Sequence, residues 1–157
     1  MIIESIKFTE IIEAGNFIRE VFDDSVSAEY SSDGVSHFYE MVTEHSIRER
    51  FLNGSRINVA KVDNRIAGYI EITGLNHIYL LFIRREFQNK GIGRKLIDDS
   101  LNVLRENNPE LNKLTVNSTL FAVKIYEKLG FRKMADFQFK NGIMSYPMSL
   151  MINEDEN

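Results

Sequence analysis

Hydrophobic residues recur with two different periods along this chain, and the period changes near residue 55. Before that point they recur every three or four positions, which is typical of helices with one buried face. Ile11, Ile18 and Phe22 define such a face, and Thr9 is suited to cap the helix that carries them. Taken over the whole chain, the helical pattern predicts helices over about 10–22, 33–53 with a break near 44–46, 91–107 and 120–129.

From residue 57 onward the pattern favours strands. Asp63-Asn64 is a two-residue hairpin turn between two segments of alternating polarity. Residues 77–83 are almost entirely apolar, as expected of a central strand that is covered on both faces. The predicted strands cover 2–7, 57–62, 65–73, 77–83, 113–117, 131–139 and 143–150.

The order of these elements predicts the fold class. One helix joins 77–83 to 113–117, so these two strands are expected to be parallel with a right-handed connection. Asn141-Gly142 predicts a hairpin between the last two strands. The chain is therefore expected to form an α/β (α+β) fold with a mixed sheet of six to seven strands and helices on both faces. We expect a single domain over 1–152 and a disordered acidic tail over 153–157.

Composition narrows the function classes. The 157 residues contain no cysteine, which excludes disulfides, thiolate metal sites and a cysteine nucleophile. Three scattered histidines do not have metal-ligand spacing, so no metal is expected. The net charge of −4 disfavours a nucleic-acid partner. No apolar run approaches the length of a membrane span and no signal peptide is apparent, so a cytoplasmic protein is expected.

The most informative segment lies between the apolar strand and the helix at 91–107. The first turn of a helix has unpaired N–H groups and a partial positive charge, so it attracts anions. Gly91 and Gly93 have no Cβ atom, and a phosphate could therefore approach the backbone closely. Lys90, Arg94 and Lys95 add positive charge at the same place. The segment predicts a pyrophosphate site, against the alternative that the glycines only permit a tight turn.

Two other anion-binding loops fit this segment poorly. A P-loop requires Gly-Lys followed by Ser or Thr, and neither follows here. A dinucleotide-binding loop requires a third glycine, but Leu96 occupies that position.

Here the chain resembles the GNAT superfamily of N-acetyltransferases. The signature of that family is Gln/Arg-x-x-Gly-x-Gly/Ala after its fourth strand, and Gln88 to Gly93 match it as Gln-Asn-Lys-Gly-Ile-Gly. A second matching stretch runs from Leu114 to Asn117 and continues from Tyr126 to Phe131. The resemblance covers about 57–150. It departs at Arg85, where the family often has proline, in a position that precedes the loop.

The resemblance implies an acetyl-CoA site. Backbone N–H groups of 89–94 would hold the pyrophosphate, Phe82 and Ile83 would offer backbone hydrogen bonds to the pantetheine arm, and the two parallel strands would diverge to leave a slot for the thioester. The residues expected to bind coenzyme A are Phe82, Ile83, Gln88, Asn89, Lys90, Gly91, Ile92, Gly93, Arg94, Lys95, Asn117 and Tyr126.

Two residues are candidates for catalysis. The resemblance points to Tyr126 for the leaving thiolate. An unperturbed phenol has a higher pKa than a thiol (about 10 against about 8.5), so hydrogen bonding is favoured over full proton transfer. The alternative is a tyrosine that only packs on the sheet. Glu71 shares a strand face with Tyr69 and could act as a base through water, unless it is solvated or salt-bridged.

Other residues carry weaker hypotheses. His77 has a suitable pKa range but starts a strand, where a turn hydrogen bond is the commoner use. Tyr79 could line the acceptor cleft, although core packing is favoured, and the same choice applies to the aromatics of the N-terminal helices. Strict alternation along 65–73 places Ile66, Ile70 and Ile72 together on one face.

The sequence thus predicts direct transfer of an acetyl group to a primary amine of a small molecule or peptide, within a ternary complex. A module that senses acyl-CoA without catalysis and a structural domain without a cofactor are the alternatives. Dimers are common in this superfamily, so the resemblance leaves a homodimer open, with the C-terminal hairpin as its candidate interface.

Overall fold

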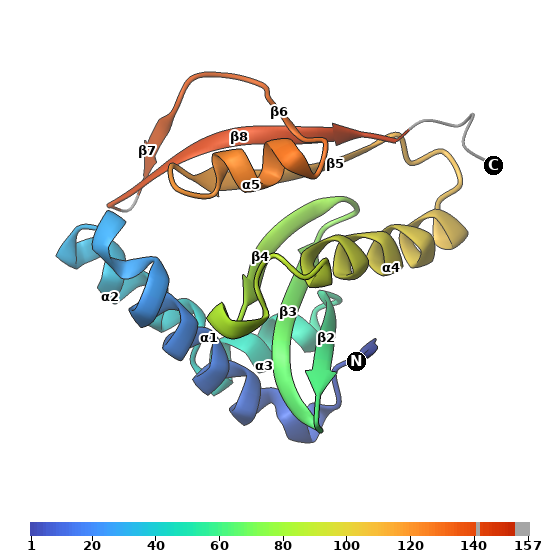
Figure 1. The fold of residues 1–157 in the computed structure, drawn as a ribbon, viewed down its shortest axis with the longest axis horizontal. Helices are drawn as coiled ribbons and strands as arrows, with labels where there is room; N and C mark the ends of the chain where they lie inside the picture. The colour runs from blue at the N-terminus through green and yellow to red at the C-terminus, as the bar shows by residue number, and fades with distance from the viewer. Residues whose placement is uncertain (141, 153–157) are drawn as a thin grey trace.

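The computed structural model describes residues 1–140 and 142–152, and its centre is a mixed sheet. Eight strands form this sheet in the order β1-β2-β3-β4-β5-β8-β6, with β7 also paired to β8. Figure 1 shows β2 to β4 in one part of the molecule and β5 and β8 in another. The strands are β1 (Ile2–Ser5), β2 (Arg56–Val62), β3 (Arg65–Thr73), β4 (His77–Ile83), β5 (Lys113–Thr119), β6 (Arg132–Lys133), β7 (Gln138–Lys140) and β8 (Ile143–Met151). The predicted fold class is confirmed.

The helices agree with the sequence pattern except at their ends. α2 and α3 separate at Val42 and Thr43, just before the predicted break, because Thr43 accepts a hydrogen bond from the Ser46 N–H and begins a new helix. The helices are α1 (Ile11–Ser25), α2 (Ser32–Met41), α3 (Glu44–Leu52), α4 (Ile92–Asn107) and α5 (Val123–Lys128), with short 3₁₀ turns at Phe8–Glu10, Ser27–Glu29 and Arg85–Phe87. Asn141 of the predicted turn and the predicted tail at 153–157 lie outside the described residues.

The prediction of one continuous strand over 131–139 is wrong. β6 pairs with Met148 and Ser149, whereas β7 pairs with the start of β8. The carbonyl of Pro147 accepts a hydrogen bond from the Met134 N–H, so the backbone of Pro147 faces this neighbouring segment. Proline has no N–H to donate there, and the ladder is interrupted. The sheet therefore has one strand more than predicted, and Pro147 was the signal in the sequence.

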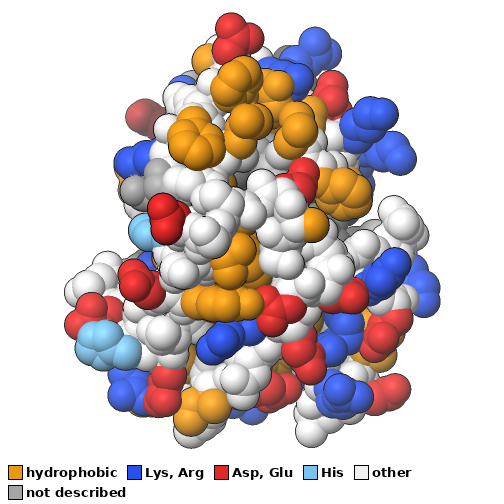
Figure 2. Space-filling model, turned by 90° about the vertical axis from the view of Figure 1, so that its left-hand side faces the viewer, with side chains coloured by type: hydrophobic (Ala, Val, Ile, Leu, Met, Phe, Trp, Pro, Cys, Tyr) orange, Lys and Arg blue, Asp and Glu red, His pale blue; other side chains and the backbone are white. Residues whose placement is uncertain are grey.

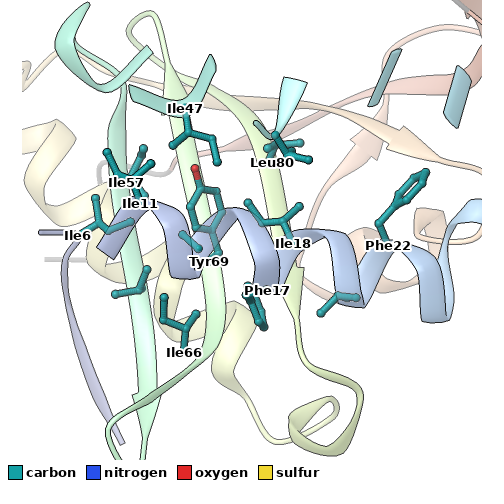
Figure 3. Close-up of a cluster of buried hydrophobic side chains, with 14 of the residues drawn as sticks. Ile6, Ile11, Phe17, Ile18, Phe22, Ile47, Ile57, Ile66, Tyr69 and Leu80 are labelled. Carbon is teal, nitrogen blue, oxygen red and sulfur yellow. The ribbon is translucent and has the colours of Figure 1, made fainter. Parts of the chain in front are cut away.

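Two hydrophobic clusters lie on opposite faces of the sheet. Helices α1 to α3 cover the first face, and α4 and α5 cover the second. Figure 3 shows the first cluster, where Tyr69 of β3 lies among Ile11, Ile18 and Leu80. The N-terminal helices and α4 therefore lie on opposite sides of the sheet.

A β-bulge changes the predicted side-chain faces of β3. Ala60 pairs with Gly68 but Lys61 pairs with Ile66, so Ala67 is an extra residue in the ladder. Ile66 consequently lies in the first cluster with Tyr69, while Ile70 and Ile72 lie in the second. The prediction that Ile66 shares their face is wrong, because a bulge reverses the alternation.

The C-terminal part exposes many hydrophobic side chains. Figure 2 shows hydrophobic side chains gathered at the top of the face that it views. The large exposed hydrophobic residues of this part include Leu120, Phe121, Ile125, Met134, Phe137, Phe139 and Met144. Such a patch is consistent with an interface, and the homodimer stays a prediction.

Candidate active site

The two parallel strands β4 and β5 diverge almost as soon as they pair. Only His77 with Thr115 and Ile78 with Val116 are paired. A bulge in β4 coincides with this point, since Glu71 pairs with Leu80 but Ile72 pairs with Ile78, which leaves Tyr79 extra. Bulges bend a strand and increase its twist, so the bulge directs the rest of β4 away from β5. The predicted divergence is confirmed, and it begins earlier than the predicted position at Phe82 and Ile83.

The open edge of β4 presents backbone groups of alternate residues. The Arg84 N–H donates to the Ala67 carbonyl of β3 at 2.8 Å, and Tyr69 is the partner of Phe82 in the same register. In an antiparallel ladder, groups of alternate residues face the same side. The amide and carbonyl of Phe82 therefore face β3 and are not available to a bound arm. Leu81 and Ile83 face the opening; the sequence analysis named Ile83 but not Leu81, because the register was not known.

The predicted anion loop follows directly on this edge. Gly91 has φ +81° and lies immediately before α4, and Asn89 has φ +61°. A Cβ atom added to Gly91 or Gly93 would meet no other atom within 4 Å. The space next to Gly91 and Gly93 is therefore open at the first turn of α4, where unpaired N–H groups attract anions.

Several side chains of the loop are held by the protein itself. The Gln88 amide donates from Nε2 to the Ile83 carbonyl at 3.0 Å, which ties the loop to the end of β4. The Arg94 guanidinium donates to the Lys128 carbonyl at 3.1 Å and ties α4 to α5. Lys90 lies 5.7 Å from the ring centre of Phe87, and the side chain of Ile92 belongs to the core. Gln88 and Arg94 thus position the loop, whereas Lys90 and the exposed Lys95 contribute charge.

Asn117 lies on β5 at the opening, and Tyr126 lies on α5, the helix that follows β5. Tyr126 of α5 is buried and packs edge-on against Phe131 at 5.3 Å between ring centres. Burial raises its pKa well above the ordinary value, so the phenol stays protonated. Among the described residues, no hydrogen bond involves its hydroxyl group. Asn117 is exposed on β5, one residue beyond the last pair with β4.

Glu71 is engaged in a buried ion pair. Its carboxylate accepts from Arg50 Nε at 2.6 Å and Nη2 at 3.2 Å, and from the Tyr69 hydroxyl at 2.6 Å. The Glu71 side chain is 0% exposed, and the Arg50 guanidinium lies over the ring of Tyr79 at 4.7 Å. Burial disfavours a charged Arg50, but Glu71 outweighs this effect and the pKa of Arg50 is raised. The geometry matches the salt-bridged alternative for Glu71. Its buried carboxylate has no accessible oxygen that could act as a base.

This network stabilises the bulge from the side of α3. Replacing Arg50 with methionine is expected to lower the free energy of unfolding by about 3–5 kcal/mol, because the Glu71 carboxylate would stay buried without its cation. Urea denaturation measures the change. The matched control is Arg48→Met on the same helix, where the partly exposed pair with Glu44 contributes at most about 1 kcal/mol. Equal effects of the two substitutions would show that the buried pair does not stabilise the site.

The three histidines have separate environments. His77 shares a 2.7 Å hydrogen bond between its Nδ1 and Thr115 Oγ1 at the closed end of the two strands, and burial lowers its pKa. His45 is exposed and lies 3.3 Å from Glu49, and His37 is half-buried on α2. Within residues 1–140 and 142–152, no three His, Cys, Asp or Glu side chains gather as metal ligands. In the same part of the chain, no helix is long and apolar enough to cross a membrane.

A groove with a volume of about 640 Å³ lies on another flank of α4. It runs from Arg94 to Arg105 against Gly130 and Leu150, and neither β4 nor its bulge contributes to it. It touches the anion loop at Arg94 alone, so its shape does not define the opening between β4 and β5.

Divergent parallel strands beside an open, glycine-rich helix N-terminus define the class of GNAT-type acyltransferases. The family model described as an acetyltransferase (GNAT) domain matches residues 26–152. The chain belongs to the GNAT acetyltransferase family, and the resemblance seen in the sequence is confirmed.

Solved structures share the fold over nearly the whole chain at low sequence identity. A GCN5-related N-acetyltransferase from Rhodopseudomonas palustris has a TM-score of 0.81 at 15% identity, with 96% of this chain and 95% of that chain covered. The PaiA N-acetyltransferase from Thermoplasma acidophilum, in complex with coenzyme A, has a TM-score of 0.78 at 16% identity, with 97% and 100% covered. An aminoglycoside 6′-N-acetyltransferase complexed with coenzyme A has a TM-score of 0.68 at 11% identity, and both chains are fully covered. No curated protein sequence matches this chain.

Proposed function

We propose that this protein transfers the acetyl group of acetyl-CoA to a primary amine, which attacks directly in a ternary complex. The observation that carries this proposal is the opening between β4 and β5, which begins after Ile78 and ends beside the accessible N-terminus of α4. A donor bound at the helix would reach through the sheet between these strands. The acceptor would meet it from the face that α1 to α3 cover.

The residues on the donor side fit coenzyme A. The open space over Gly91 and Gly93 admits a pyrophosphate against the N–H groups of 89–94, where Lys90 and Lys95 add positive charge. The backbone of Leu81 and the N–H of Ile83 face the opening and can pair with the amides of a pantetheine arm, as an added strand would. The Ile83 carbonyl is already occupied by Gln88.

The reaction replaces a carbon–sulfur bond with a carbon–nitrogen bond. The thioester of acetyl-CoA supplies an activated acyl group. A neutral amine nitrogen attacks its carbonyl carbon, the bond to sulfur breaks, and the amine loses a proton to water. The N–H of Ile83 or Leu81 can stabilise the negative charge on the carbonyl oxygen. The Tyr126 hydroxyl donates a hydrogen bond to the departing thiolate sulfur.

Deprotonation of the acceptor is the remaining requirement. An alkylamine has a pKa of about 10.4, so roughly one molecule in a thousand is neutral near pH 7.4. Glu71 cannot reach the amine while both of its oxygens bind Arg50 and Tyr69. In this proposal Glu71 positions the bulge through Arg50 and Tyr79, and water in the opening carries the proton away.

Two measurements test the function. Acetyl-CoA at 100 times its Kd should stabilise the protein by about 2.7 kcal/mol, which raises the Tm of a chain of this size by roughly 5–10 °C. A panel of amines should then release free thiol from acetyl-CoA faster than the protein alone does. Stabilisation without release for any amine would favour the acyl-CoA sensor, and no stabilisation would favour a structural domain.

A further inference from the structure

A carboxylate from the N-terminal third of the chain is held just past the end of β5, one of the two strands that form the opening. Glu29 ends the 3₁₀ turn Ser27–Glu29, and its Oε1 accepts a hydrogen bond from the Phe121 N–H at 2.9 Å. Phe121 follows β5 by two residues, on the part of the chain that continues from Asn117 at the opening. One oxygen of Glu29 is thus tied to the C-terminal part of the molecule, while its side chain is exposed.

A second contact bridges the same two parts of the molecule. The Ser31 hydroxyl donates to the Gly142 carbonyl at 3.1 Å. Gly34 lies so close that a Cβ atom on it would be 2.6 Å from the same carbonyl oxygen. Figure 1 shows the start of α2 next to the start of β8 at this place. Figure 2 looks onto this side, where hydrophobic side chains are visible in the middle of the face. Two hydrogen bonds therefore connect the segment before α2 to the C-terminal part of the chain, one at Phe121 and one at Gly142.

Tyr30, the residue after Glu29, packs against the aromatic part of the first core cluster. Tyr30 packs edge-on against Phe22 at 5.0 Å and Phe38 at 6.2 Å between ring centres. Phe38 in turn lies 5.7 Å from Phe82, which belongs to the diverging part of β4. Burial raises the pKa of Tyr30 to about 12, so this ring stays uncharged near neutral pH. A carboxylate beside electron-rich rings favours a cation over a neutral ligand.

We propose that the acceptor is a small aliphatic amine and that Glu29 attracts it as the ammonium ion. The two bridging contacts limit its size, because a polypeptide could cross this face only if both were broken. This inference rests on the proposed function, since it names the substrate class of the same site. Glu29 is a specificity-determining residue: it binds the ammonium form, and the nitrogen attacks only after water has removed its proton.

The substitution Glu29→Gln removes the negative charge but keeps the hydrogen bond, because the glutamine side chain has an oxygen that can accept from the Phe121 N–H. We expect kcat/KM for a cationic alkylamine such as butylamine to fall roughly 10- to 100-fold, as for loss of a hydrogen bond to a charged group. The kcat/KM for aniline, which is neutral at pH 7.5, should change less than about threefold if the charge alone matters. The matched control is Asp33→Asn, which removes a nearby exposed charge and should leave both values unchanged.

The outcomes distinguish this inference from the proposed function. Equal losses for butylamine and aniline in Glu29→Gln would reduce Glu29 to a structural contact and overturn the inference. A hexapeptide with a free N-terminus should be acetylated at least 100-fold less efficiently than butylamine by the unaltered protein, since the bridges exclude it. Comparable rates for the hexapeptide would overturn the size limit while the acetyltransferase assignment stands. If no amine at all is acetylated, the proposed function fails first, and the inference fails with it.

Discussion

Glutamate in place of Gly91 should raise the Kd for coenzyme A by more than about 100-fold, because a carboxylate would face a pyrophosphate at contact distance. The side chain would occupy the open space over the first turn of α4, where a Cβ atom meets no protein atom within 4 Å. The fold should survive, since the cost of a side chain at φ +81° is about 1–2 kcal/mol. Calorimetric titration with coenzyme A measures the affinity directly.

Gly54 offers a matched control for this prediction. It also has a positive φ, +102°, and open space around its Cβ position, but it lies in the turn between α3 and β2. Gly54→Glu therefore adds the same charge and a similar backbone strain away from the loop. We expect it to lower Tm as much as Gly91→Glu does and to leave the Kd unchanged. Unaltered coenzyme A affinity in Gly91→Glu would show that the donor does not bind at this helix.

Phenylalanine in place of Tyr126 should lower kcat by roughly 10- to 100-fold, the equivalent of a hydrogen bond to a charged group of about 1.5–3 kcal/mol. The Kd for acetyl-CoA should hardly change. The aromatic ring and its packing against Phe131 are retained, so only the hydroxyl group is lost. Because burial raises the pKa of Tyr126, full proton transfer to the thiolate is less favourable than for an exposed tyrosine, and the effect on kcat should reflect hydrogen bonding.

Steady-state kinetics and calorimetry on one preparation separate these two quantities. Tyr146→Phe on β8 is the control, because that ring packs in the same cluster and lies beside Lys133. It should leave kcat within about twofold of the unaltered protein, because the tyrosine hydroxyl that it removes has no role in the proposed reaction. A Tyr126→Phe protein with unchanged kcat would remove Tyr126 from the reaction, and a parallel rise in Kd would make it a binding residue instead.

Much of the site was accessible from the sequence because its signals are local. The glycines of the loop, the apolar strand before it and the amphipathic helix after it each depend on residues close in the chain. The range predicted for β4, 77–83, agrees with the structure. The family signature from Gln88 to Gly93 predicted the anion site for the same reason.

The errors arose where distant segments meet. Phe82 was expected to offer its backbone to the donor, but the register with β3 turns this backbone toward β3, and Leu81 and Ile83 face the opening instead. Glu71 was considered as a base, although Arg50 comes from α3 to neutralise it. The sequence around Phe82 does not reveal its register with β3, and the sequence around Glu71 does not reveal Arg50. Periodicity predicts which side chains share a face of a strand, but it does not predict which residues pack on that face.

The sequence by itself determined the elements, the anion loop and the family, since these follow from periodicity, glycine placement and short motifs. The tertiary structure alone decided how the two sides of the site come together. The bulge at Tyr79 exists only as a mismatch between β3 and β4, and the contact of Glu29 with Phe121 joins residues 92 positions apart. Such features depend on packing between elements, and packing is a property of the folded chain.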